Sequence, residues 1–140
     1  MKIYEILQNL NLVEEKGISR ERIESEQYRL YAAQRALIPT GYARFLEKSN
    51  GIQTDTLSLF GIRDDESGLI RDIYDNNTLN GTQDQSDKIF LGDNFFEYLV
   101  YDWQQKCYLV INKKNENEQK FFPLFEHAVL YFLRKYIEKA

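Results

Sequence analysis

Few side chains in this sequence are of the types that usually perform catalysis or bind metals. His127 is the only histidine and Cys107 the only cysteine, so a zinc site built from these two residue types would lack ligands. The two could form a nucleophilic dyad, but Cys107 stands within an apolar run, where a cysteine is usually an inert small hydrophobe. The glycine motifs of acyl, phosphoryl and dinucleotide chemistry do not occur. The sequence therefore gives no positive sign of an enzyme, and we predict no cofactor and no metal.

Carboxylates are the remaining candidates for chemistry. Asp64 and Asp65 stand side by side, and Asp93 and Asp102 flank a predicted strand. Either set could supply the acid and the base of a glycoside hydrolase. Aspartates in turns more often accept hydrogen bonds from the nearby backbone and so form the turn. We therefore expect these side chains to form turns rather than to catalyse a reaction.

Charge is distributed unevenly along the chain. The net charge is −4, but residues 53–102 contain eleven carboxylates against three basic side chains, a balance of −8. Residues 1–52 balance at +1 and residues 103–140 at +3. An acidic middle third would repel a phosphate backbone, so we expect no direct nucleic-acid binding. It would either attract a basic protein or form a solvated loop region that aids solubility.

Trp103 has the residue type most typical of a protein-binding site. It is the only tryptophan, it is predicted at the tip of a hairpin, and it follows Asp102. Its ring either folds back over the sheet edge or anchors a partner, since tryptophan is enriched among binding hot spots. The predicted partner surface combines Trp103 with carboxylates of the acidic third: Asp64, Asp65, Glu66, Asp75, Asp93 and Asp102.

The first third of the chain is predicted to be helical. Residues 2–13 have apolar side chains at helical spacing, and Ser19 is a suitable N-cap for a second helix over about residues 20–35. A third helix is predicted to begin at Pro39 and to stop at Asn50-Gly51. We expect its core-facing side chains to be Tyr42, Phe45 and Leu46.

The rest of the chain has the pattern of strands followed by one helix. We predict strands over Leu57–Phe60, Lys88–Gly92, Tyr98–Tyr101, Cys107–Ile111 and Lys120–Phe122. Residues 69–74 fit either a strand or a helical turn, residues 75–87 have the composition of a loop, and Trp103–Lys106 is predicted as a hairpin loop. A closing helix is predicted over Leu124–Tyr136. The expected fold is a single α+β domain over residues 1–140, with N-terminal helices, an antiparallel-rich mixed sheet and a C-terminal closing helix.

The cellular compartment can also be predicted. A single cysteine fits a reducing environment, and the N-terminal residues lack the pattern of a signal peptide. No apolar run approaches the length of a membrane span. We therefore expect a cytoplasmic protein without a membrane partner.

Two blocks of sequence resemble the signatures of the SUKH superfamily. The first block is Ile38-Pro39, Tyr42, Phe45-Leu46, Asn50-Gly51 and Leu59-Phe60-Gly61. The second is Ile89-Phe90-Leu91-Gly92-Asp93-Asn94 with Tyr98-Leu99-Val100-Tyr101-Asp102. The similarity extends over roughly residues 38–138 and rests on the order and spacing of these motifs. Relatives often have small or glycine residues after the Leu-Gly-Asp, where this chain has Phe95-Phe96.

The resemblance implies a function in protein binding. The SUKH superfamily includes the yeast cell-wall-assembly regulator, the Syd protein and many bacterial immunity proteins, often against nucleases. It therefore implies an immunity protein that binds and neutralises a cognate toxin, and the phosphate-binding surface of such a toxin would be basic. The alternative is a cytosolic regulatory or scaffold module without a toxin partner, as the role of the yeast relative suggests.

Overall fold

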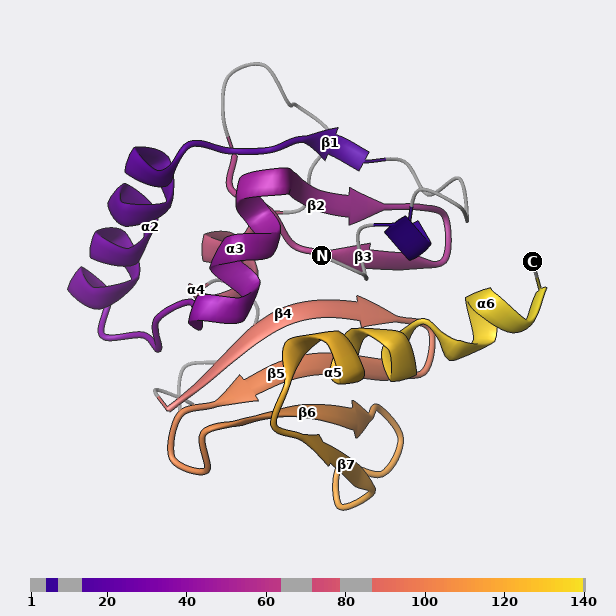
Figure 1. The fold of residues 1–140 in the computed structure, drawn as a ribbon. Coiled ribbons are helices and arrows are strands. Elements are labelled where there is room, and N and C mark those ends of the chain that lie inside the picture. Colours follow the sequence, from indigo (N-terminus) through magenta and orange to yellow (C-terminus); the bar gives the residue numbers. More distant parts are fainter. Residues whose placement is uncertain (1–4, 8–13, 64–71, 79–86, 140) are drawn as a thin grey trace.

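The computed structural model describes residues 5–7, 14–63, 72–78 and 87–139, and these residues form an α+β fold (Figure 1). The strands are β1 (Glu14–Lys16), β2 (Ser49–Gln53), β3 (Leu57–Leu59), β4 (Lys88–Asn94), β5 (Glu97–Asp102), β6 (Cys107–Asn112) and β7 (Gln119–Phe122). The helices are α2 (Arg20–Ala32), α3 (Thr40–Lys48), α4 (Ile73–Thr78), α5 (Phe125–Phe132) and α6 (Arg134–Lys139).

The sheet has seven strands, and their spatial order is their order in the chain. All six pairings of these strands are antiparallel. Among the described residues, parallel pairing is found in an isolated bridge between Gly61 and Asp72. Helix α5 packs on β5, β6 and β7 (Figure 1), and α6 closes the described chain, as the α+β prediction expected.

Helices α2 and α3 confirm the predicted elements, with shifts at their ends. Ser19 is the N-cap of α2, where its Oγ accepts a hydrogen bond from the backbone N–H of Arg22 at 3.3 Å. The helix ends at Ala32 rather than at residue 35, and Gln34 then takes a positive φ of 59°. Pro39 is the N-cap of α3, one position before the helix, where its lack of an N–H costs no intrahelical bond.

The predicted core face of α3 is confirmed. Tyr42, Phe45 and Leu46 are fully buried. The rings of Tyr42, Phe45 and Phe125 lie with centroids 5.5–5.6 Å apart, which joins α3 to α5. The Tyr42 hydroxyl donates to the carbonyl oxygen of Phe60 at 2.6 Å and lies 3.1 Å from that of Leu91.

The predicted role of Asn50-Gly51 as a helix stop is wrong. Helix α3 ends at Lys48, and both residues lie inside β2. The Asn50 side chain donates to the carbonyl of Ile62 at 2.7 Å and accepts from the Ile62 N–H at 2.8 Å. These two bonds pair the backbone groups of Ile62 as a neighbouring strand would. Gly51 has a φ of +86°, and a Cβ atom there would lie 2.5 Å from the Leu59 carbonyl oxygen. Glycine is therefore required by this close approach within the sheet.

Three further elements differ from the prediction. Strand β1 was not predicted, residues 75–78 belong to α4 rather than to a loop, and the closing helix is interrupted at Leu133 between α5 and α6. Asn77 explains the second difference, because its side chain bonds both the N–H and the carbonyl of Phe90 at 2.7 and 2.9 Å. The predicted first helix lies mostly outside the described residues. Within it, residues 5–7 are helical and Leu7 is buried.

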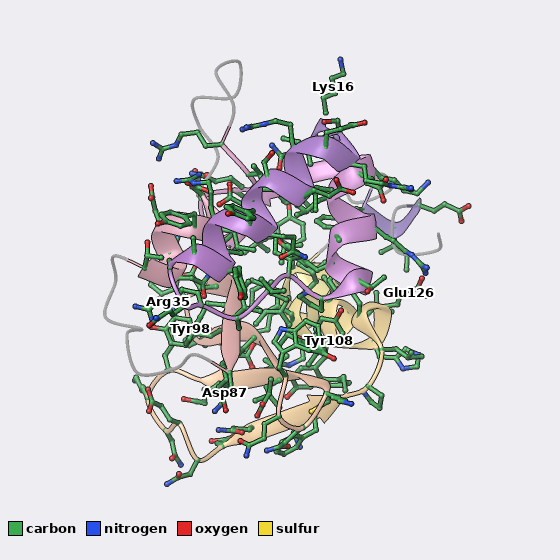
Figure 2. The ribbon with its side chains drawn as sticks, turned by 90° about the vertical axis from the view of Figure 1, so that its left-hand side faces the viewer. Lys16, Arg35, Asp87, Tyr98, Tyr108 and Glu126 are labelled. Atoms are coloured by element: carbon green, nitrogen blue, oxygen red, sulfur yellow. The ribbon has the colours of Figure 1, made fainter. Side chains whose placement is uncertain are left out.

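Strands β5 and β6 bury side chains on both faces. Tyr108 faces α5, where its ring lies 5.6 Å from that of Phe125. Tyr98 belongs to the opposite face (Figure 2). On that face a second apolar cluster contains Val100, Leu109 and Ile111, with Phe90, Tyr98 and Cys107 packed against it.

Candidate functional site

The structure separates the residues that the sequence grouped into one partner surface. Asp93 pairs with Tyr98 at one end of the β4–β5 ladder, and Lys88 pairs with Asp102 at the other end. Four residue steps along β5 correspond to about 13 Å. Trp103 follows Asp102, so it lies at the opposite end of the ladder from Asp93. Residues 64–66, which include Asp64, Asp65 and Glu66, lie outside the described residues.

Asp102 is a turn-forming residue. Its side chain is buried, with 2% of the residue exposed. Its Oδ1 accepts hydrogen bonds from the backbone N–H groups of Gln104 at 2.9 Å and Gln105 at 3.3 Å. These bonds fix the four-residue loop between β5 and β6, as expected for an aspartate in a turn. The Asp102 carboxylate is therefore buried within its own turn.

Trp103 is folded back onto the protein. Its indole Nε1 donates a hydrogen bond to the carbonyl of Leu37 at 2.7 Å. Its ring meets that of Tyr101 edge-on, with centroids 5.0 Å apart. The backbone N–H of Trp103 also donates to the carbonyl of Asp87 at 2.8 Å. The ring therefore folds back onto the protein, but at the end of the interior strand β5 and against the connection between α2 and α3 rather than over a sheet edge, and 38% of the residue remains exposed.

Most carboxylates described in the acidic third have an internal partner. Asp75 pairs with Arg63 at 3.1 Å, and Asp93 lies 3.5 Å from the Nζ of Lys113. Glu97 is 8% exposed, and it pairs with Arg134 at 2.6 Å. Among the described carboxylates, these three therefore each have a cation close by, Arg63, Lys113 and Arg134.

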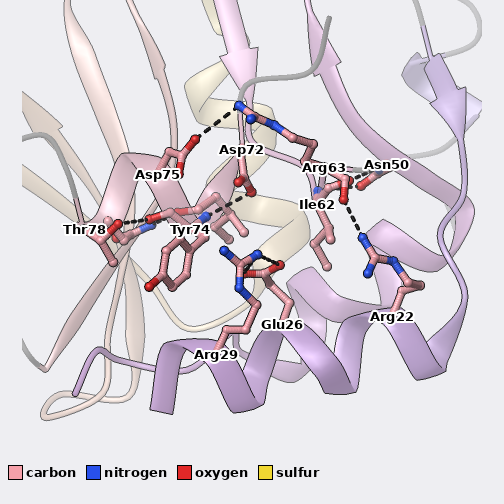
Figure 3. Close-up of polar contacts among 12 residues, drawn as sticks. Arg22, Glu26, Arg29, Asn50, Ile62, Arg63, Asp72, Tyr74, Asp75 and Thr78 are labelled. Carbon is pink, nitrogen blue, oxygen red and sulfur yellow. Dashed lines mark hydrogen bonds and ion pairs between the residues drawn. The ribbon is translucent and has the colours of Figure 1, made fainter. Parts of the chain in front are cut away.

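A buried acidic pair joins α2 to α4 (Figure 3). Glu26 and Asp72 are 2% and 5% exposed. A guanidinium nitrogen of Arg29 lies 3.2 Å from Glu26, and the same guanidinium stacks 4.0 Å from the centre of the Tyr74 ring. Asp72 accepts a hydrogen bond from the Tyr74 N–H at 3.2 Å. These contacts fix α2 against the beginning of α4.

The two acids of this pair have raised pKa values. Burial is the main cause of the raised pKa of Glu26, and the nearby Asp72 adds to it, while Arg29 acts in the opposite direction. Burial also raises the pKa of Asp72, and the hydrogen bond from the Tyr74 backbone opposes that rise. Sequence reasoning missed the pair because no local sequence signal showed that Glu26 faces inward.

The most exposed large apolar side chains at one end of the sheet are two adjacent phenylalanines. Phe95 and Phe96, in the turn between β4 and β5, are 75% and 52% exposed. The turn is fixed by Asn94, whose Oδ1 accepts from the backbone N–H groups of Phe96 at 2.9 Å and Glu97 at 2.8 Å. The Nζ of Lys135 lies 4.0 Å from the centre of the Phe96 ring. An ordered turn therefore presents both rings to solvent.

A shallow, open pocket of about 520 Å³ lies next to this turn. One wall is the turn between β2 and β3, and the other is the end of β4. The lining residues are Gln53, Thr54, Asp55, Thr56, Leu57, Ser58, Asp93, Asn94, Phe95 and Lys113. We call Phe95, Phe96 and this pocket the Phe95 surface.

In the part of the chain that the structure describes, neither the Cys107–His127 dyad nor the Asp93–Asp102 pair is brought together for catalysis. Cys107 lies on the face of β6 opposite to α5, and α5 carries the exposed His127. Burial and the Asp102 charge raise the pKa of the Cys107 thiol. Asp93 and Asp102 lie at opposite ends of the β4–β5 ladder, with backbones about 13 Å apart along the strand direction, whereas the carboxyl groups of glycosidase pairs lie roughly 5–9.5 Å apart. Among the described residues, no group of three or more His, Cys, Asp or Glu side chains could hold a metal ion.

No protein-family model and no curated protein matches this chain. Within the residues that the structure describes, none of the helices combines the length and the apolar composition needed to cross a membrane.

Proposed function

We propose that this protein acts by binding another protein. In this proposal it is an immunity protein that neutralises a cognate toxin, and the toxin considered first is a nuclease. The resemblance to the SUKH superfamily is one support for this proposal. Its two sequence blocks meet in the core, because the Tyr42 hydroxyl contacts the carbonyls of Phe60 and Leu91. The residues of both blocks therefore build one structural unit.

The observation that carries the proposal is the exposure of Phe95 and Phe96. Covering two adjacent exposed aromatic side chains with a partner is favourable, since burial of apolar surface contributes about 25 cal/mol per Å². Phenylalanine is also enriched at the centre of protein interfaces. The hydrogen bonds of Asn94 hold the turn in place before binding, which reduces the entropy lost on association.

The proposal places this binding in the cytoplasm and requires no cofactor and no catalytic residue. Neutralisation would follow from physical obstruction of the toxin's active site. Asp75, Asp93 and Glu97 are engaged by internal cationic partners. We therefore expect apolar contact to provide most of the affinity, and charge to accelerate the encounter.

A capture experiment at two salt concentrations tests the proposal. The tagged full-length protein is immobilised and exposed to a lysate of its source cells, at roughly 0.05 M and then 0.5 M salt. We expect one basic protein in stoichiometric amount, with slower association at the higher salt. A diffuse set of client proteins would favour the regulatory alternative, and the absence of any captured protein would contradict both.

A further inference from the structure

We infer that the partner docks on the Phe95 surface and inserts a basic side chain, arginine or lysine, flanked by an apolar residue. This inference rests on the proposed function and names its contact surface and the chemistry of the partner segment. Three properties of the surface support it: hydrogen bonds hold its walls in place, carboxylates line its pocket, and the Phe95 ring is exposed.

The walls of the pocket are ordered by hydrogen bonds. In the β2–β3 turn, the backbone N–H of Thr54 donates to the Leu57 carbonyl at 2.9 Å. The Thr54 hydroxyl oxygen accepts from the backbone N–H groups of Thr56 and Leu57, each at 3.2 Å. The other wall is held by the β3–β4 register, in which Leu57 pairs with Asn94. A partner segment would therefore meet a preformed pocket, as is usual for binding sites.

The charged groups of the pocket favour a cation. Its lining includes two carboxylates, Asp55 and Asp93, and one ammonium group, Lys113, a balance of −1 for the lining alone, while Lys135 lies outside the lining, over the Phe96 ring. Asp55 is exposed on the turn. Asp93 and Lys113 are 3.5 Å apart, and the Lys113 Nζ also lies 4.9 Å from the centre of the Tyr98 ring. An arriving guanidinium can pair with Asp55 and share Asp93 with Lys113, since a carboxylate accepts several hydrogen bonds.

The aromatic rings provide the second part of the recognition. The stacking of Lys135 on Phe96 shows that a cation is accommodated on a ring of this turn. Phe95 is 75% exposed, so its ring is accessible to the side-chain stem of an arginine or to an adjacent apolar residue. A phosphate group would instead meet Asp55 and Asp93, which makes nucleic acid a poor occupant of this pocket.

Matched variants of the full-length protein test the docking surface. The probe is the protein captured from the lysate, identified by mass spectrometry and purified after nuclease treatment. Phe95→Ala removes the open ring, and Asp55→Lys reverses the exposed charge. Tyr28→Ala removes another exposed ring, on α2, and Asp87→Lys makes the same charge change next to Lys88, at the other end of β4. The unfolding curve of each variant is recorded first.

We expect Phe95→Ala and Asp55→Lys each to weaken binding by at least about tenfold, the scale of an interface hot spot. Tyr28→Ala and Asp87→Lys should change it by less than about threefold. If Asp55→Lys fails to fold, Asp55→Asn replaces it, because the smaller change keeps the size of the turn residue. A charge reversal of the contacting partner residue should restore binding to Asp55→Lys.

Three results would overturn the inference. Equal binding by all four variants would place the interface elsewhere and leave the proposed function standing. Loss of capture after nuclease treatment would show that nucleic acid, rather than a protein side chain, made the contact. If the wild-type protein captures nothing, both the inference and the proposed function fail.

Discussion

Removing the Tyr42 hydroxyl is expected to destabilise the protein measurably. The hydroxyl donates to the Phe60 carbonyl at 2.6 Å and lies 3.1 Å from the Leu91 carbonyl, and the residue is fully buried. Burial also raises the pKa of Tyr42 well above its usual range, so the hydroxyl stays protonated and remains a donor. In Tyr42→Phe the ring keeps its packing against Phe45 and Phe125, and the loss is confined to hydrogen bonding.

The expected loss is about 1–3 kcal/mol, because a buried hydrogen bond contributes about 1 kcal/mol and the hydroxyl contacts two carbonyl oxygens. Denaturant unfolding of wild type and Tyr42→Phe measures this difference, with the slope of the transition unchanged. Tyr28→Phe is the matched control. Tyr28 is 73% exposed, so its stability should change by less than about 0.5 kcal/mol. If Tyr42→Phe were as stable as its control, the contact joining the two sequence blocks would contribute nothing to folding.

The remaining predictions concern the core, the buried acids and the thiol. Phe45→Ala should cost about 3–5 kcal/mol of unfolding free energy, and a soluble variant with an unchanged melting curve would refute its place in the core. Because the folded-state pKa of Glu26 is raised, this carboxyl stabilises the fold below its unfolded pKa, about 4.3, and that stability is lost as pH rises through the folded pKa. Wild type should therefore gain stability relative to Glu26→Gln between pH 7 and pH 4, and a constant difference in unfolding experiments would contradict this. Burial raises the pKa of Cys107, so at pH 8 the native thiol should react with a disulfide reagent more slowly than the urea-unfolded chain, and equal rates would contradict its burial.

Much of the helical structure could be predicted because its signals are local. The cap residue Ser19 and the spacing of Tyr42, Phe45 and Leu46 act within one or two turns. The break at Leu133 was missed because the apolar stripe continues through it. Residues 75–78 of helix α4 were predicted as a loop because their side chains are polar, whereas the Asn77 side chain bonds the backbone of β4, at a residue 13 positions further along the chain.

The candidate site could be predicted only in part. The Asp102 turn follows from local chemistry, and the structure places it as expected. The separation of Asp93 from Trp103 depends on strand register, which arises from long-range pairing. The exposure of Phe95 also depends on strand register. An aromatic-rich strand pattern does not show at which residue the chain turns. A local signal was nevertheless present in Asn94, whose residue type favours a turn immediately before the two phenylalanines.

The central claim is that this protein neutralises a toxic protein by contact through the Phe95 surface. The most direct test is growth of cells that express the captured partner, alone and together with wild type, Phe95→Ala, Asp55→Lys or Tyr28→Ala. We predict growth arrest with the partner alone, rescue by wild type and Tyr28→Ala, and loss of rescue with Phe95→Ala and Asp55→Lys. A partner that does not arrest growth, or an arrest that wild type fails to relieve, would contradict the claim.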